Sequence, residues 1–375
     1  MDAPVSVKNK NSSSLRAGVA LDVGTTTVQA QLIDLDTSAV LETFSAFNEQ
    51  RIFGADVMSR ISAAQSGKLD DLFLAINNQT ESILKHFIIT YKLPGIEKCV
   101  VSGNTVMLHI FCRENPSSMG AAPYTPVFLE ERQFKGEEIS LSAANITLLP
   151  CISAFLGADV AAGLAFLDIM NKGQDALFVD IGTNGEIAVW KKCEKKFYCC
   201  SAAAGPCFEE AEISCGLTAS AFIDAIAQMK KLSAIDETGA LSDDFALTGF
   251  PVAEGKIITQ KDIRQFQLAK SAIFSGIKTL CKTARLTFDK IEKAFIAGGL
   301  GYNLNLESAS LTGLYPAELI EKTSVCGNTS LMGAAKCLIE PDFLRHCSEI
   351  VLRSETTELA GDKYFAAAFA HNMYV

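Results

Sequence analysis

The residues best suited to chemistry are two aspartates that follow apolar runs and precede a glycine and a threonine. The segments are Ala20-Leu21-Asp22-Val23-Gly24-Thr25-Thr26-Thr27 and Phe178-Val179-Asp180-Ile181-Gly182-Thr183-Asn184-Gly185. In each, an apolar strand delivers a carboxylate, the glycine permits a tight turn, and the following amides and hydroxyls face an anion. Two such turns facing each other can hold a triphosphate from both sides.

The two aspartates themselves suit a metal ion better than a phosphate, because like charges repel. Carboxylates bind Mg²⁺, which usually keeps several of its waters in proteins. We therefore expect Asp22 and Asp180 to hold Mg²⁺ largely through water. For either turn alone, an ordinary β-hairpin after an aspartate is an equally good interpretation. The presence of both turns favours the phosphate site.

A third element is the segment Ala294-Phe295-Ile296-Ala297-Gly298-Gly299-Leu300-Gly301. A buried strand ends there in three glycines, which lets a flat base or a phosphate approach the backbone closely. Alone, this pattern is weak, since the further spacing of a dinucleotide fingerprint is absent. Its position in the second half of the chain strengthens it.

Hydrophobic periodicity predicts the order β-β-β-α-β-α twice, which indicates an internal duplication. In the first half we expect strands at 17–23, 27–33, 39–47 and 98–102, and helices at 54–64, 69–87, 104–111 and within 149–162. In the second half we expect strands at 176–181, 186–191, 196–201 and 293–297, and helices at 217–230, 263–284 and 330–339. Two related lobes facing each other form a cleft, where ligands usually bind.

The predicted domain organisation follows from these patterns. We expect a flexible tail at 1–16, a first lobe at 17–172, a second lobe at 173–340 with a surface insertion near 233–255, and an appendage at 341–375, helical near 363–371.

Composition narrows the function further. The chain has 375 residues and a formal net charge of −10, which argues against nucleic-acid and anionic-membrane partners. No apolar run is long enough for a membrane helix. The 12 cysteines are scattered without C-x-x-C spacing, and the four histidines lack ligand spacing, so we expect a cytoplasmic protein with idle thiols.

The three glycine-containing segments are similar to the phosphate-1, phosphate-2 and adenosine motifs shared by actin, sugar kinases, heat-shock chaperones and acetate kinases. More narrowly, the chain resembles the ATP-binding domain of the reductive activators of corrinoid proteins, from about residue 17 to 340. The matching stretches include 21–27, 53–60, 102–107, 123–124, 157–160, 180–186, 203–206, 297–301 and 332–335.

This resemblance implies an α/β fold of two duplicated RNase H-like lobes, of the actin and hexokinase type, with a nucleotide cleft between them. It also implies an Mg-dependent ATPase that drives reduction of cob(II)amide to cob(I)amide on a partner corrinoid protein. The cofactors would be ATP and Mg²⁺, and an iron-sulfur cluster would supply the electron.

The resemblance also implies roles for individual residues. The phosphates would meet Gly24, Thr25, Thr26, Gly182, Thr183, Asn184 and Gly185, and the nucleotide pocket would include Gly298, Gly299, Gly301 and Gly333. Asp159 occupies the place of the acid that orients the attacking water, although helix capping or a salt bridge would explain it nearly as well. Glu209 and Glu212 either reach a ribose hydroxyl or are surface carboxylates.

The chain departs from the family in one respect, since it lacks the plant-type C-x₄-C-x₂-C spacing of a ferredoxin-like domain. We therefore expect no iron-sulfur cluster on this chain and a separate ferredoxin-like donor, or else a helper that reduces nothing. A cluster bridging a homodimer through Cys207 and Cys215 is a further option. Two other functions stay open: a small-molecule kinase, whose pocket Asp56 and Asn104 would line, and a non-catalytic nucleotide-sensing scaffold.

Overall fold

The first half of the chain forms a six-stranded sheet around the first aspartate turn. A computed structural model describes residues 15–182, 184–208, 216–300 and 304–375. The first sheet has the strand order β3-β2-β1-β4-β6-β5. Its strands are β1 (Ala17–Val23), β2 (Thr27–Asp34), β3 (Val40–Phe47), β4 (Ile96–Gly103), β5 (Arg132–Lys135) and β6 (Ala143–Leu148). The first three strands, which were predicted, run antiparallel, and β4 joins β1 in parallel.

The second half repeats this arrangement around the second aspartate turn. Its sheet has the order β13-β12-β7-β8-β9-β14. The strands are β7 (Ala176–Ile181), β8 (Asn184–Lys191), β9 (Lys196–Ala203), β12 (Lys293–Ala297), β13 (Thr323–Gly327) and β14 (Ser354–Thr356). A separate hairpin, β10 (Phe250–Ala253) and β11 (Lys256–Ile258), forms at the end of the region 233–255 where an insertion was predicted.

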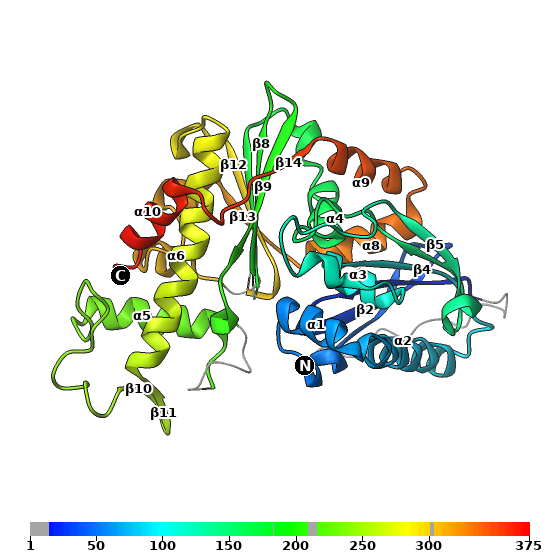
Figure 1. Ribbon diagram of the computed structural model, residues 1–375, viewed down its shortest axis with the longest axis horizontal. Coiled ribbons are helices and arrows are strands. Elements are labelled where there is room, and N and C mark those ends of the chain that lie inside the picture. Colours follow the sequence, from blue (N-terminus) through cyan, green and yellow to red (C-terminus); the bar gives the residue numbers. More distant parts are fainter. Residues whose placement is uncertain (1–14, 183, 209–215, 301–303) are drawn as a thin grey trace.

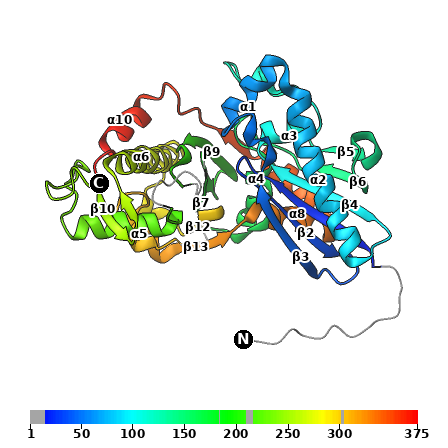
Figure 2. The ribbon, with the colours of Figure 1, turned by 90° about the horizontal axis from the view of Figure 1, so that it is seen from below.

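The shared topology confirms the predicted fold of two duplicated lobes, which lie side by side in Figures 1 and 2. In each sheet an antiparallel trio of strands continues into two parallel strands, β1-β4-β6 and β7-β12-β13. Strands β5, β6, β13 and β14 were not predicted. They are short, with few alternating apolar residues, so pairing with neighbouring strands determines them more than their own periodicity.

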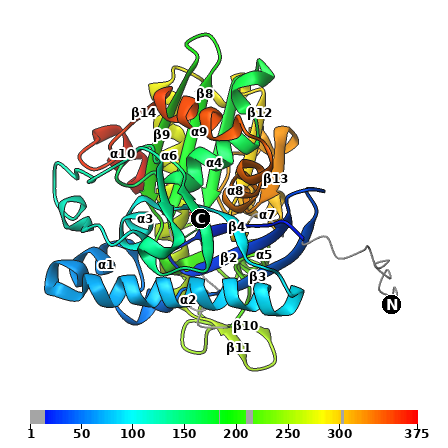
Figure 3. The same cartoon turned by 90° about the vertical axis from the view of Figure 1, so that its right-hand side faces the viewer.

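Ten α-helices in the described ranges surround the sheets. They are α1 (Val57–Ala63), α2 (Leu69–Tyr91), α3 (Thr105–Phe111), α4 (Ala158–Phe166), α5 (Ala219–Lys231), α6 (Gln260–Thr283), α7 (Leu306–Leu311), α8 (Thr329–Ile339), α9 (Phe343–Leu352) and α10 (Lys363–His371). Helix α2, seen in Figure 3, buries Leu72, Ile76 and Phe87 in the core of the first sheet. None of the described helices is both long and apolar enough to cross a bilayer.

Helices α4 and α8 connect the two halves (Figure 1). Leu331 and Leu338 of α8, from late in the chain, pack into the core of the first sheet. Val160 of α4 packs instead into the core that contains Phe178 of the second sheet. Helix α8 therefore covers the sheet of the opposite half, whereas α4 packs into both cores, since its Ala158 and Ala162 belong to the core of the first sheet.

The crossing is close because small residues meet there. A Cβ atom built on Gly333 of α8 would lie 2.6 Å from the carbonyl oxygen of Ala162 in α4. One built on Gly163 of α4 would lie 2.5 Å from the hydroxyl of Thr329. Both distances are far below van der Waals contact, so glycine at these positions sets the spacing of the helices.

Residues 341–375 are tied to the second half by several contacts. Helix α9 places Cys347 and Ile350 in the same core as Phe178, and β14 pairs in parallel with β9. The helix predicted near 363–371 is α10. After it, the side-chain amide of Gln267 donates to the carbonyl of Met373 at 2.6 Å.

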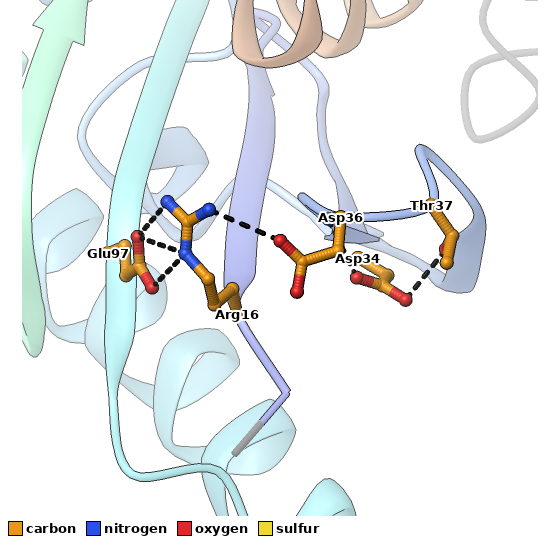
Figure 4. Close-up of polar contacts among 5 residues, drawn as sticks. All are labelled: Arg16, Asp34, Asp36, Thr37 and Glu97. Carbon is orange, nitrogen blue, oxygen red and sulfur yellow. Dashed lines mark hydrogen bonds and ion pairs between the residues drawn. The ribbon is translucent and has the colours of Figure 1, made fainter. Parts of the chain in front are cut away.

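An exposed ion network fixes the start of β1 (Figure 4). The guanidinium of Arg16 donates to Glu97 at 2.9 Å and to Asp36 at 3.2 Å. Within the following turn, the Thr37 hydroxyl donates to Asp34 at 2.6 Å. Exposed ion pairs add little to net stability, so the network serves mainly to align β1 with β4 and with the turn after β2.

Replacing Gly333 by alanine tests the importance of the helix crossing. The added methyl group would meet the backbone of α4, which cannot move as a flexible side chain can. We expect Gly333→Ala to lower the free energy of unfolding by about 1 to 3 kcal/mol, measured by urea denaturation. Gly95→Ala is the control, since nothing lies within 4 Å of a Cβ atom there. Equal stability of the two variants would contradict the crossing as described.

Candidate functional site

One cavity of about 380 Å³ lies where the two aspartate turns meet. Asp22 and Asp180 both line it, which agrees with the expectation that they face one crevice. The other lining residues predicted from the sequence are Gly24, Thr25, Thr26, Asp159, Gly182, Asn184, Gly298 and Gly299. The volume falls in the range of small-molecule sites, about 300 to 1,000 Å³.

The two turns have similar internal bonding. In the first, the Gly24 amide donates to the carbonyl of Thr27 at 3.0 Å; in the second, the Gly182 amide donates to the carbonyl of Asn184 at 2.9 Å. The buried hydroxyl oxygen of Thr26 has no hydrogen-bond partner among the described residues. Buried polar atoms are normally satisfied, so this atom in the wall of the cavity is suited to a ligand with oxygen atoms, such as a phosphate.

Asp22 is held by residues at the start of α8. The side-chain amide of Asn328 and the hydroxyl of Ser330 each donate to one carboxylate oxygen of Asp22, both at 2.7 Å. Ser330 also contacts the hydroxyl of Ser102 at 2.9 Å. Burial raises the pKa of Asp22, while these two hydrogen bonds oppose the rise. The carboxylate is therefore fixed in orientation.

Asp180 lies in a strongly unfavourable environment for a charge. Burial, followed by the charges of Asp159 and Asp22, raises the pKa of Asp180 to about 8. Burial and then the Asp22 charge likewise raise the pKa of Asp159. The pKa of Glu186, which pairs with Asp180 across the hairpin, is raised by burial and then by the charges of Asp159 and Asp180. Four carboxyl groups thus repel one another around a single cavity.

This acid set fits a cation bound through water. A divalent ion would offset the mutual repulsion of the carboxylates, and oxygen donors are those Mg²⁺ prefers. No group of three or more His, Cys, Asp or Glu side chains in the described parts of the chain is arranged to hold a metal. Direct coordination by several side chains is therefore not the arrangement seen, whereas the predicted water-mediated binding needs no such cluster.

Asp159 lies in the first turn of α4 and lines the cavity. One of its carboxylate oxygens accepts a hydrogen bond from the amide of Val160 at 2.8 Å. A carboxylate at a helix N-terminus is favoured by the helix dipole. Both roles considered for this residue, contact with the site and stabilisation of its own helix, are thus compatible with its position.

The glycine turn after β12 lines the part of the cavity next to Asp180. Gly298 has a φ of +90°, and a Cβ atom there would lie 2.3 Å from a carboxylate oxygen of Asp180. Only glycine combines this backbone conformation with such close approach. Phe208 and the start of α5, at Thr218 to Ser220, also line the cavity.

Two predicted residues lie away from the cavity lining. A Cβ atom on Gly185 would be 2.8 Å from Ile273 of α6, and Gly333 packs on α4 as described above. Thr183, Glu209 and Gly301 lie outside the described residues, as do Glu212 and Cys215. The other cysteine of interest, Cys207, is buried, which raises its thiol pKa to about 12.

The two residues considered for a kinase pocket are placed differently. Asn104 lines the cavity, while its side chain accepts from the amide of Val106 at the start of α3. Asp56 caps α1 by accepting from the amide of Ser59 at 2.8 Å.

Sequence reasoning missed Gln29, Asn328 and Ser330, and gave no role to Glu186. The hairpin register offers a signal for two of them, because it pairs Asp22 with Gln29 and Asp180 with Glu186. Asn328 is recognisable as the residue that precedes a helix and caps it. Its contact with Asp22 depends on the packing of α8 and has no local signal.

Duplicated lobes that each bring an acidic glycine turn to a shared cavity define the ASKHA class, the actin- and hexokinase-like proteins. The chain belongs to the RACo family. The family model of the RACo middle region matches residues 17–172, and that of the C-terminal domain of RACo, the ASKHA domain, matches 174–238 and 216–375. The resemblance inferred from the motifs is thereby confirmed.

Relatives of the chain are named as activators or reductases of corrinoid proteins. It is 29% identical to the corrinoid activation enzyme RamQ of Eubacterium limosum, covering 95% of this chain and 70% of the relative. It is 28% identical to the Methanosarcina barkeri [Co(II) methylated amine-specific corrinoid protein] reductase, covering 89% of this chain and 72% of that protein. A solved reductive activator for corrinoid,iron-sulfur protein superposes with a TM-score of 0.89 at 28% identity, covering 97% of this chain and 67% of that one.

Replacing Asp180 by asparagine is expected to stabilise the nucleotide-free protein. In the folded state its pKa is about 8, against an ordinary value of 3.8. The stability linked to this shift is fully present below pH 3.8 and is lost as the pH rises to about 8, because the folded state then holds a proton that the unfolded state has released. We expect Asp180→Asn to be more stable than the wild type by about 1 to 3 kcal/mol at pH 8, in urea denaturation.

The matched control is Asp243→Asn, at an exposed aspartate. It should follow the wild-type dependence of stability on pH between 4 and about 8. If Asp180→Asn shows the same dependence as the control, the acid repulsion described here is absent.

Proposed function

We propose that this protein is an ATP-dependent reductive activator of a corrinoid protein. Binding and hydrolysis of ATP in the cavity would drive reduction of cob(II)amide to cob(I)amide on the partner. The observation that carries the proposal is the cavity in which two acidic glycine turns meet, within a chain of the RACo family. The names of its relatives support the corrinoid partner.

The proposed division of labour assigns the nucleotide to the two turns. Gly24, Thr25, Thr26, Gly182 and Asn184 would meet the phosphates, and Gly298 and Gly299 would adjoin the adenosine. Asp22 and Asp180 would hold Mg²⁺ through its waters. When bound, the ion would neutralise phosphate charge and so favour attack by water.

Asp159 is the proposed general base for that water. Its pKa is raised by burial and by Asp22, which brings a carboxyl group toward the range where it can accept a proton near neutral pH. The products of this step are ADP and phosphate. The electron is separate: one electron converts cob(II)amide to cob(I)amide, and hydrolysis supplies free energy but no electron.

We propose that the electron comes from a separate ferredoxin-like iron-sulfur protein. The printed sequence contains no C-x₄-C-x₂-C run. The described cysteines are free, and burial raises the thiol pKa of most of them, which suits a reducing compartment such as the cytoplasm.

The crossing helices offer a route from the nucleotide to the lobes. Helix α4 begins beside the cavity with Asp159, and α8 begins there with Ser330. Because α8 packs on the opposite half and α4 packs into both cores, a change at the cavity that moves either helix would also move one lobe relative to the other. Such a movement is the proposed link between ATP and the corrinoid partner.

Visible spectroscopy of a corrinoid protein in the cob(II)amide state tests this function. With a low-potential donor, this protein and Mg-ATP, we expect the cob(I)amide band to appear. Asp180→Ala should stay folded and lose ATP hydrolysis and the band together, by about 100-fold or more, since it removes a metal-binding carboxylate. Asp243→Asn should behave as the wild type. Formation of the band at equal rate without ATP or without this protein would overturn the proposal.

A further inference from the structure

A buried arginine contacts the first aspartate turn at residues 24–26, which is called the first phosphate turn below because its amides would meet phosphate. Arg60, on α1, is fully buried and does not line the cavity. Its Nη2 donates to the carbonyl of Thr25 at 2.5 Å, and its Nε donates to the carbonyl of Gly54 at 3.0 Å. Its Nη1 donates to the side chain of Gln50 at 3.2 Å. One planar side chain thus joins the turn to two other segments of the first lobe.

Asn48 holds the carbonyls on either side of Thr25. Its side-chain amide donates to the carbonyl of Gly24 at 2.8 Å, and its backbone amide donates to that of Thr26 at 2.8 Å. Asn48 and Gln50 are themselves fully buried, and each has a polar group bonded to the other. Three consecutive carbonyls of the phosphate turn are therefore fixed from one side.

The direction of the carbonyls determines that of the amides. In a trans peptide the C=O and N–H groups point in opposite directions. A Thr25 carbonyl bonded to Arg60 directs the Thr26 amide away from Arg60, and a Gly24 carbonyl bonded to Asn48 directs the Thr25 amide away from Asn48. Thr25 and Thr26 line the cavity, whereas Arg60 and Asn48 do not. The open side for these amides is the cavity.

We infer that Arg60 is a positioning residue for the nucleotide: it holds the first phosphate turn with its amides toward the polyphosphate. The guanidinium suits this task because its rigid fork bonds several oxygens at fixed angles, which a lysine ammonium cannot reproduce. The inference rests on the proposed function, since it assumes that this cavity binds a nucleotide.

The stretch 53–60 was part of the sequence resemblance, and the proposed function leaves it without a role. The structure assigns the end of that stretch to the phosphate turn. Since Arg60 would act through backbone amides that meet phosphate, its loss should affect phosphate-bearing ligands selectively.

Binding of ATP and of adenosine to Arg60 variants tests the inference. By calorimetry, we expect Arg60→Ala to weaken ATP binding by about 10- to 100-fold, as for loss of charged hydrogen bonds, with little change for adenosine. Added guanidinium ion should restore much of the ATP affinity by filling the vacated space. Arg60→Lys, which keeps the charge but loses the fork, should also bind ATP more weakly than the wild type. If Arg60→Ala does not fold, the comparison of ATP with adenosine binding is made with Arg60→Lys instead.

The control is Arg132→Ala, which removes an arginine of the first lobe that stacks on Phe128 and bonds Glu114, away from the turn. It should keep the wild-type ratio of ATP to adenosine affinity even where its stability falls. Folded Arg60 variants that bind ATP as tightly as the wild type, or that lose ATP and adenosine equally, would overturn the inference. A wild-type protein that binds no ATP would instead refute the proposed function.

Discussion

Repulsion among buried carboxyl groups is the constraint on which the site depends. Asp22, Asp159, Asp180 and Glu186 come from four different elements and line one cavity. The charges of Asp22, Asp159 and Asp180 raise the pKa of neighbouring acids in this set. The folded protein therefore bears an electrostatic cost that an apolar core would avoid. Natural proteins keep such local conflicts mainly at functional sites. Here we propose that the conflict is relieved when a cation binds in the cavity together with phosphates.

The two helices that cross between the lobes begin beside these acids, and their packing holds the acids in place despite the repulsion. Helices α4 and α8 both begin at the cavity; α8 then packs on the sheet of the other half, and α4 packs into both cores. Helix α8 also orients Asp22 through Asn328 and Ser330. The elements that set the angle between the lobes are thus the same ones that position the charges. This arrangement is the physical basis of the proposed coupling between nucleotide binding and lobe movement.

The first phosphate turn shows a second form of preorganisation. Its carbonyls accept hydrogen bonds from Asn48 and Arg60, while the buried Thr26 hydroxyl has no partner among the described residues. The backbone of the turn is therefore held by the first lobe, and one polar atom of the turn is left for a ligand. Fixed donors of this kind need little reorganisation when an anion arrives, which makes them more effective than mobile side chains.

The sequence alone determined the elements whose signals are local. Consecutive apolar residues, an aspartate and a glycine predict β1, β7 and their turns, so Asp22 and Asp180 could be identified, and the repeat predicted the duplicated lobes. Only the tertiary structure decided which distant elements reach those turns. Periodicity shows which face of a helix is buried but not what it is buried against. The contact of Ser330 with Asp22 and the packing role of Gly333 therefore followed from the way the two halves cross. The contact of Arg60 with the first turn followed from the packing of α1 within the first lobe.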